Sequence, residues 1–246
     1  MTNVVITMAG FGRRFLEAGY DVPKYRIMAH GRSLFAWSMA SLGDFIAHGA
    51  AFTFVVRAAD EAEAFIREEA KALGIGAVSV VALDAPTDGQ ATSAMRAAPA
   101  LSNTAAPMLI YNIDTFVHPA ALPASAVRGE GWIPCFPAEG EAWSFAAADA
   151  SGRVSEVREK QRISPHATVG LYYFGSFDLY AETYRRHYAD RSNYEKGEAY
   201  VAPLYNGLIA GGAEVYIHEV PLEAVIPLGV PAEVERFLAR SPPTLG

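Results

Sequence analysis

Short apolar runs alternate with amphipathic segments along the first half of the chain. Continuous apolar runs rich in β-branched residues are typical of strands that are buried on both faces. They predict strands over residues 4–8, 52–57, 78–83 and 108–113. Apolar residues at helical spacing predict helices over residues 33–47, 60–73 and 92–100. This alternation indicates a three-layer αβα sandwich, an α/β fold whose mixed sheet is mainly parallel.

The second half of the chain is less regular and richer in strands. Expected strands cover residues 131–136, 143–148, 153–159, 167–174 and 215–220. Expected helices cover residues 178–188, 198–210 and 232–240, the second of them in spite of Pro203. The chain has no low-complexity linker and no internal repeat, so residues 1–246 are interpreted as a single domain.

Composition and charge exclude several classes of partner. The chain has 246 residues, 51% of them hydrophobic, and a formal net charge of −7. No long basic run is present, so we expect no nucleic-acid partner and no binding to anionic membranes. We also expect no membrane insertion, because no apolar stretch reaches the roughly 20 residues that span a bilayer. We expect no signal peptide, because the N-terminus lacks a basic region followed by a long apolar segment. The one cysteine, Cys135, cannot form an internal disulfide, which suits a cytoplasmic protein.

The first predicted strand leads directly into a glycine turn and a group of cations. Gly10 and Gly12 follow the strand, Arg13 and Arg14 come next, and Lys24 follows a short loop. A backbone without Cβ atoms can approach a ligand closely, and exposed amides beside cations can hold a polyphosphate. The alternative is a tight turn that carries solvated basic residues.

A dinucleotide-binding fold fits this stretch poorly. The fingerprint of that fold needs a third glycine, where this chain has Phe15. Gly19 and Pro23 would interrupt the helix that should follow, and the next strand ends at Arg57 instead of an acidic residue.

Two further groups of residues follow predicted strands. Asn112 and Asp114 come at the end of the fourth strand, where ligands bind in open α/β sheets. An aspartate there can hold Mg²⁺, which prefers one or two carboxylates and substrate phosphates. Residues 87–92 follow the third strand, and their Gly89-Gln90 turn could present amides to a base. The alternatives are an aspartate that caps a turn and a threonine, Thr92, that caps a helix.

The opening motifs MAGFGRRF (8–15) and VPKYRI (22–27) resemble those of the nucleotidyltransferases that make nucleotide-sugars and related activated headgroups. The resemblance implies a Rossmann-like nucleotidyltransferase fold of the glycosyltransferase-A type. Its nucleotide-binding half would cover about residues 1–118 and its acceptor-binding half about residues 119–246. It also implies that Arg13, Lys24 and Asp114 are the catalytic residues and that Asp114 holds Mg²⁺ or Mn²⁺. Nucleotide binding would involve Ala9, Gly10, Phe11, Gly12, Gly89, Gln90 and Asn112.

The later motifs follow the order of the same family with several departures. The family places acceptor-binding residues where this chain has Glu159, Lys160, Gly170 and Glu198. Gln161 replaces a proline that many members carry, and Gly175 stands where many members have a metal-binding aspartate. The closing turn at residues 227–231 also lacks the family's aspartate.

The sequence therefore predicts an Mg²⁺-dependent enzyme that condenses a nucleoside triphosphate with a phosphorylated small molecule and releases pyrophosphate. The acceptor would be a sugar 1-phosphate or a phosphorylated headgroup. The Gly89-Gln90-Ala91 form resembles a subgroup associated with capsular and surface polysaccharide synthesis. Asp84 occupies the position of a base-reading residue, and an acceptor-only carboxylate favours CTP over UTP. The alternatives are a glycosyltransferase of similar fold and a nucleotide-binding regulator without catalysis. A homo-oligomer is compatible with the sequence.

Overall fold

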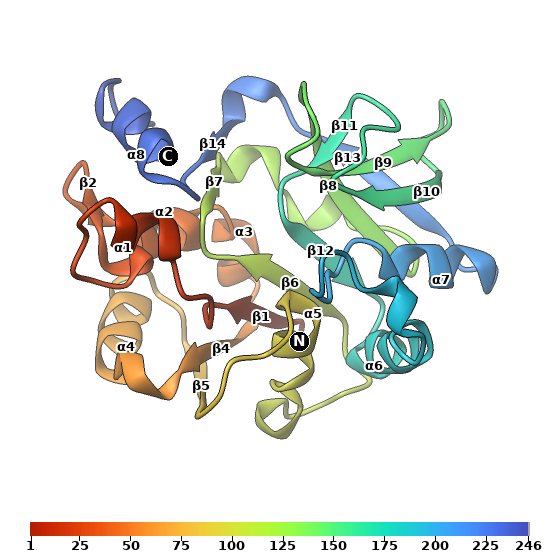
Figure 1. Cartoon of the computed structure of the whole chain (residues 1–246), viewed down its shortest axis with the longest axis horizontal. Coiled ribbons are helices and arrows are strands. Elements are labelled where there is room, and N and C mark those ends of the chain that lie inside the picture. Colours follow the sequence, from red (N-terminus) through yellow and green to blue (C-terminus); the bar gives the residue numbers. More distant parts are fainter. Residues whose placement is uncertain (246) are drawn as a thin grey trace.

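The computed structural model describes residues 1–245 and contains one large mixed sheet between two groups of helices (Figure 1). The strands of this sheet are β1 (Asn3–Thr7), β4 (Ala51–Arg57), β5 (Ala77–Leu83), β6 (Met108–Asn112), β8 (Gly131–Pro137), β9 (Ser144–Ala148), β10 (Val154–Glu159), β11 (His166–Thr168), β12 (Leu171–Phe174) and β13 (Val215–Glu219). The helices are α1 (Arg13–Glu17), α2 (Leu34–Ala40), α3 (Gly43–Ala47), α4 (Glu63–Ala72), α5 (Gln90–Met95), α6 (Phe177–His187), α7 (Leu204–Ala210) and α8 (Pro231–Leu238). The expected fold class is confirmed.

The sheet has a parallel core and an antiparallel extension. Its order is β10-β9-β11-β8-β12-β6-β1-β4-β5, and β13 pairs with the other side of β8. Strand β1 runs parallel to β4 and to β6, with Val5 opposite Thr53 and Ile110. Strand β12 is antiparallel to both β6 and β8, so it joins the two halves of the chain in one sheet. The carboxyl ends of β1, β4, β5 and β6 consequently meet at one edge.

Alternation along β1 explains why helices cover both faces. Val4 and Ile6 pack in one core with residues of α2, α3 and α4. Val5 points to the other face and packs in a second core with residues of α5, α6 and α7. Side chains alternate between faces along a strand, so a run that is apolar throughout needs cover on both sides.

Two short strand pairs complete the structure outside the main sheet. Strand β7 (Thr115–Val117) pairs with β14 (Val225–Pro227), and β2 (Met28–Ala29) pairs with β3 (Arg32–Ser33). The pair β7–β14 brings the C-terminal turn and α8 back to the end of β6. It rests on a small apolar cluster that includes Trp37, Phe116 and Phe237.

Several predicted boundaries differ from the structure. Residues 33–47 form two helices instead of one, and residues 167–174 form β11 and β12 with a break at Val169 and Gly170. The helix predicted over 198–210 begins only at Leu204, because Pro203 is its N-cap residue. Before that point the backbone of Ala199 bonds to Asp88 and Ala91 instead of to its own helix.

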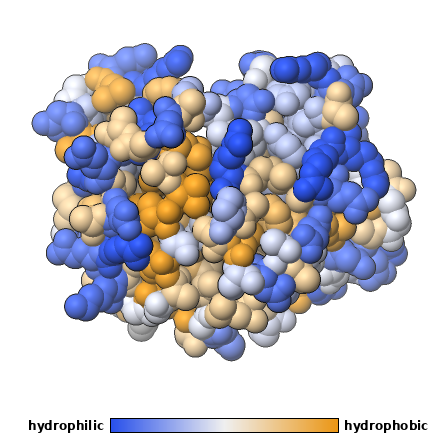
Figure 2. All heavy atoms as spheres, turned by 90° about the horizontal axis from the view of Figure 1, so that it is seen from below, coloured by the Kyte–Doolittle hydropathy of each residue, from blue (hydrophilic) through white to orange (hydrophobic). Residues whose placement is uncertain are grey.

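The edge strand β5 lies on the side from which Figure 2 is viewed, and apolar side chains gather on that face. The side chains of Val78, Val80 and Val81 in this strand are partly exposed. No helix within residues 1–245 combines the length and the apolar character that crossing a membrane requires.

Candidate active site

A cavity of about 820 Å³ opens where the parallel strands end. This is the edge at which open α/β sheets bind their ligands. Its walls come from the loop after β1, the loop before α5, the end of β6 and two later segments. The lining includes Thr7, Ala9, Gly10, Phe11, Gly12, Arg13, Lys24, Gly89, Gln90, Asn112, Asp114, Glu198 and Gly229. Most of the nucleotide-binding and catalytic residues predicted from the sequence therefore share one cavity.

The backbone of Gly12 shapes the loop after β1. Gly12 has φ of +61°, which favours glycine, and its carbonyl accepts hydrogen bonds from Phe15 and Leu16. Arg13 is exposed and makes no ion pair within residues 1–245. Its guanidinium carbon lies 5.5 Å from the centroid of the Phe11 ring. The cation of Arg13 is thus available to a ligand above the loop.

Lys24 and Asp114 form an ion pair at the floor of the cavity. The distance from Lys24 Nζ to Asp114 Oδ2 is 2.6 Å, and the side chains are 18% and 26% exposed. Lys24 begins a single 3₁₀ turn after Pro23, and Asp114 lies two residues beyond the end of β6. The two residues are 90 positions apart, so the sequence identified each of them but not their contact.

The closing turn at residues 227–231 lies against Asp114 although it has no aspartate of its own. The amide of Leu228 donates to the backbone carbonyl of Asp114 at 2.8 Å. A Cβ atom at Gly229 would lie 3.3 Å from Asp114 Oδ2. Glu233 fixes this turn, because its carboxylate accepts from the amides of Gly229 at 2.8 Å and Val230 at 3.1 Å. Sequence reasoning missed Glu233, although a proline followed by Glu two residues later is typical of a helix start.

The loop before α5 is fixed to the segment that carries Glu198. The Ala199 amide donates to Asp88 at 2.7 Å, and the Ala91 amide donates to Ala199 at 3.0 Å. A Cβ atom at Gly89 would lie 2.4 Å from the Ala199 carbonyl oxygen. The side-chain amide of Gln90 donates to Thr7 Oγ1 at 3.2 Å, which holds it over the end of β1. Two segments that are 110 residues apart in the sequence are therefore bonded together in one wall of the cavity.

Asn112 and Gly170 are packed against each other at the back of the cavity. Gly170 has φ of +81°, and a Cβ atom there would lie 2.2 Å from Asn112 Nδ2. Asn112 Oδ1 is buried and has no hydrogen-bond partner within residues 1–245. Gly170 itself does not line the cavity, so it acts on the site through Asn112.

The acceptor residues predicted from the sequence are divided between two places. Glu198 lines the main cavity, whereas Glu159 lines a neighbouring cavity of about 790 Å³ between β10 and α7. Lys160 has φ of +51°, and its ammonium donates to the Tyr200 hydroxyl at 2.5 Å. Tyr200 is two residues after Glu198, which lines the main cavity, and it bonds to Lys160, which follows Glu159 of the neighbouring cavity.

Burial raises the pKa of Glu159 above its ordinary value, and the nearby carboxylates of Glu195 and Glu198 raise it further. A hydrogen bond from Ser144 and the charge of Lys160 oppose that rise. Burial likewise raises the pKa of Tyr200, and its hydrogen bond with Glu198 adds to the effect. The Tyr200 hydroxyl is therefore protonated at neutral pH.

Asp84 lies outside the main cavity. It is exposed directly after β5, and the lining begins two residues later at Pro86. Gln90 is the residue of this loop whose side chain reaches the end of β1.

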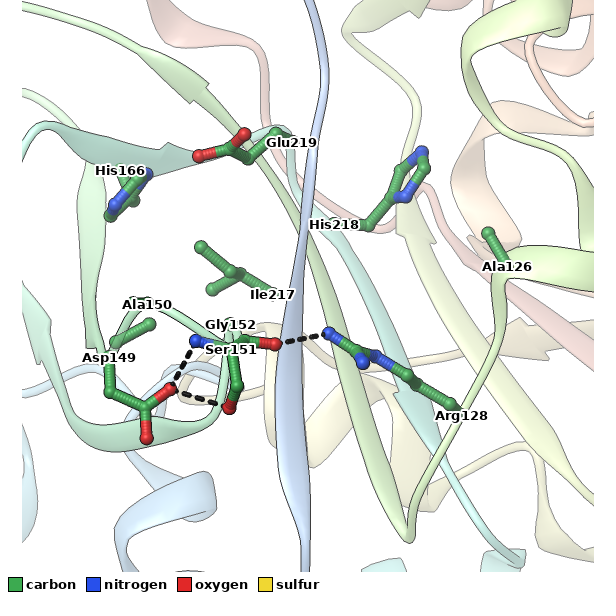
Figure 3. A pocket seen from close by; sticks show the side chains of 11 residues that line it. Ala126, Arg128, Asp149, Ala150, Ser151, Gly152, His166, Ile217, His218 and Glu219 are labelled. Atoms are coloured by element: carbon green, nitrogen blue, oxygen red, sulfur yellow. Dashed lines mark hydrogen bonds between the residues drawn. The ribbon is translucent and has the colours of Figure 1, made fainter.

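A further polar cavity, of about 640 Å³, lies between the end of β9 and β13 (Figure 3). Asp149 accepts hydrogen bonds from the amide and hydroxyl of Ser151, and Arg128 donates to the Ser151 carbonyl at 2.8 Å. These groups satisfy one another around a turn. The cavity contains none of the residues that the sequence predicted for the site.

Comparison with solved structures decides the family. The chain is 35% identical to a nucleoside-diphosphate-sugar pyrophosphorylase from Vibrio cholerae RC9, with a TM-score of 0.90. The match covers 96% of this chain and 100% of that chain. The chain belongs to the nucleotidyltransferases of the nucleotide-diphospho-sugar transferase superfamily. The resemblance inferred from the opening motifs is thereby confirmed.

More distant nucleotidyltransferases share the fold. An inositol-1-phosphate CTP transferase from T. maritima is 15% identical, with a TM-score of 0.76 and coverage of 99% of this chain and 98% of that chain. A glucose-1-phosphate thymidylyltransferase from Bacillus anthracis, in complex with a sucrose, is 12% identical, with a TM-score of 0.74. That match covers 97% of this chain and 94% of the other. No family model matches the chain, and no curated protein matches it.

Proposed function

We propose that this nucleotidyltransferase condenses a nucleoside triphosphate with a phosphorylated small molecule and releases pyrophosphate. The observation that carries the proposal is the Lys24–Asp114 ion pair in the same cavity as the exposed Arg13 and its glycine loop. Two cations and one carboxylate at the carboxyl ends of parallel strands suit a triphosphate that reacts at its α-phosphorus. The 35% identical relative is a pyrophosphorylase by its description, which supports the same reaction type.

The reaction needs positioning and charge neutralisation more than covalent chemistry from the protein. An oxygen of the acceptor phosphate attacks the α-phosphorus of the triphosphate, and the bond between the α-phosphorus and the bridging oxygen breaks. Pyrophosphate leaves with the electron pair of that bond. Lys24 lies between the two reacting phosphates and offsets their repulsion, while Arg13 holds the departing pyrophosphate. The acceptor phosphate is already ionised, so the step requires no general base.

The residues present fit a magnesium or manganese ion that is held partly by the substrate. Asp114 would supply a carboxylate, and the buried, unpartnered Asn112 Oδ1 would supply a second oxygen in the same cavity. Within residues 1–245 no group of three or more His, Cys, Asp or Glu side chains is placed to hold a metal. Mg²⁺ commonly takes one or two carboxylates and completes its shell with phosphates and water. Charge neutralisation at the α-phosphate is the chemistry that such an ion would supply when bound. Lys24, which contacts Asp114, lies where it would contact the phosphates.

The donor in this proposal is a pyrimidine triphosphate, with CTP ahead of UTP, and the acceptor is a sugar 1-phosphate or a phosphorylated headgroup. The Gln90 amide, which can both donate and accept, lines the cavity and is our candidate for reading the base. Asp84, whose carboxylate suggested CTP, would need to enter the cavity to read the base. Glu159, Lys160, Gly170 and Glu198 serve the acceptor side. The product would supply surface polysaccharide synthesis in the cytoplasm.

The experiment is a panel of the common triphosphates crossed with sugar 1-phosphates and phosphorylated headgroups, with pyrophosphate release as the readout. We expect one donor and acceptor pair to react in the presence of Mg²⁺ or Mn²⁺, and Asp114→Asn to abolish the reaction. Competition between CTP and UTP, repeated with Asp84→Gln and Gln90→Ala, identifies the residue that reads the base. Nucleotide binding without pyrophosphate release for any pair would instead support a regulator, and full turnover in excess chelator would contradict the metal assignment.

A further inference from the structure

A smaller hollow of about 260 Å³ lies beside the main cavity, on the other side of Phe11. The two hollows share Phe11, Gly12 and Lys24 in their linings. The remaining lining of the smaller hollow includes Pro23, Arg57 and Asp60. Phe11 and Gly12 therefore form a thin partition, and the same lysine is reached from both sides.

Arg57 brings a cation to this partition from a different strand. It is the last residue of β4, so it lies at the same sheet edge as the loop after β1. Its guanidinium carbon is 5.1 Å from the centroid of the Phe11 ring, and that of Arg13 is 5.5 Å from the same centroid. The two guanidinium carbons consequently lie within about 11 Å of each other. Phe11, which is 43% exposed, is the side chain that both cations contact.

The carboxylate of Asp60 fixes one edge of the Arg57 guanidinium. Nε donates to Asp60 Oδ2 at 3.2 Å, and Nη2 donates to Asp60 Oδ1. The side chain of Asp60 is only 5% exposed, whereas that of Arg57 is 25% exposed. A ligand in the hollow would therefore reach the guanidinium before the carboxylate. Nη1 makes no hydrogen bond within residues 1–245. A planar guanidinium held in this way loses little side-chain freedom when it binds an anion with its other edge.

We infer that Arg57 binds the terminal phosphate of the triphosphate and then the released pyrophosphate, together with Arg13. This inference rests on the proposed function. The α-phosphate would lie near Lys24 and Asp114, and the two outer phosphates would extend over Phe11 toward Arg57. The leaving group gains negative charge as its bond to the α-phosphorus breaks, and the two guanidiniums beside one aromatic ring would share that charge.

The test is the affinity for inorganic pyrophosphate, measured by titration calorimetry. Arg57→Gln alone would leave the buried Asp60 without its partner, so the main variant is the double variant Arg57→Gln with Asp60→Asn. Asp60→Asn alone keeps the cation and is the first control. Arg67→Gln, an exposed arginine paired with Glu63 on α4, is the matched surface control.

We expect the double variant to bind pyrophosphate about 10-fold more weakly, because a charged contact of this kind is worth on the order of 1.4 kcal/mol or more. The KM for the triphosphate should rise by a similar factor, while the KM for the acceptor should stay unchanged. Arg67→Gln should keep the wild-type affinity, and Asp60→Asn, which keeps the cation, should lose less affinity than the double variant. A folded double variant whose pyrophosphate affinity lies within two-fold of wild type would overturn the inference. The calorimetric result does not require turnover, so failure of the proposed reaction is distinguishable from failure of the Arg57 assignment.

Discussion

Lys24 and Asp114 neutralise each other at 2.6 Å in the absence of a substrate. The pair keeps both side chains in place, so little ordering is needed when phosphates arrive. Both side chains are partly shielded from water, so the Coulombic attraction between them is stronger than it would be in bulk water. The sequence identified the two residues from their motifs, but only the fold of the chain between them brings them together.

The first prediction concerns the cations of the main cavity. Lys24→Met and Arg13→Ala should each lower kcat/KM by about 100-fold or more, because each removes a charged contact with the reacting phosphates. Steady-state kinetics with the pair of substrates found in the panel measures the effect. Lys71→Met, at an exposed position in the last turn of α4, should leave the rate unchanged. Activity of a folded Lys24→Met variant within a few-fold of wild type would contradict the assignment.

The second prediction uses the raised pKa of Glu159. Because the folded state favours the protonated carboxyl, the ionised form costs stability, and this cost grows as the pH rises from the ordinary pKa to the raised pKa. Below the ordinary pKa the carboxyl is protonated in both states and the cost disappears. Glu159→Gln should therefore raise the free energy of unfolding at pH 7 and have little effect at pH 4.

Urea unfolding at both pH values measures this difference. Glu235→Gln, an exposed carboxyl on α8, serves as the control and should show no such dependence on pH. A Glu159→Gln variant that is less stable at pH 7 than at pH 4, relative to wild type, would show that the carboxylate is stabilising where it lies.

At the scale of elements, the strands of the parallel core were the most predictable part of the chain. The apolar runs of β1, β4, β5 and β6 are long enough to identify a strand without tertiary information. Residues 198–203 were predicted wrongly as helix, because their polar and aromatic pattern resembles a helix start. Tertiary hydrogen bonds from Ala199 to the loop before α5 decide their conformation instead.

The third prediction follows from that contact. Gly89→Ala would place a Cβ atom 2.4 Å from the Ala199 carbonyl oxygen and would push the two segments apart. The KM values for triphosphate and acceptor should rise together, because one segment carries Gln90 and the other carries Glu198. Overpacking of this kind should also cost about 1–3 kcal/mol of stability.

Gly74→Ala is the control for adding a side chain at a glycine with positive φ that has no close neighbour. Gly74 has φ of +75° at the end of α4, but an added Cβ atom there meets no other atom within 4 Å. This variant should lose some stability and leave both KM values unchanged. If Gly89→Ala raises the KM of only one substrate, the two segments are not coupled in the way described.

At the scale of the whole molecule, the sequence predicted the fold class and most of the residues that line the main cavity. It predicted contacts between distant segments less well. Arg57 and Glu233 were not assigned to the site, because their roles depend on neighbours that the sequence does not bring close. Asp84 was placed near the base by counting from Gly89, and the structure puts it outside the cavity lining. Lys160 was assigned to the acceptor, and the structure places its ammonium on Tyr200.

The fourth prediction is that the chain unfolds as one cooperative unit. Strand β12 bonds to β6 and to β8, so the two halves share a continuous sheet and cannot separate without losing backbone hydrogen bonds. Scanning calorimetry should show a single transition that shifts upward as a whole with the preferred triphosphate and Mg²⁺. A ligand at 100 times its Kd adds about 2.7 kcal/mol to the free energy of unfolding. Two resolved transitions, with only one of them sensitive to nucleotide, would indicate two separate domains.

The contact between Gly170 and Asn112 has a consequence for how this sequence can change over evolutionary time. Any side chain at position 170 would overlap the amide of Asn112, and the positive φ there adds a second penalty. A substitution at 170 therefore costs less once residue 112 has become smaller, and this favours one order of the two changes. In a library randomised at both positions, survivors that lack glycine at 170 should carry alanine or glycine at 112.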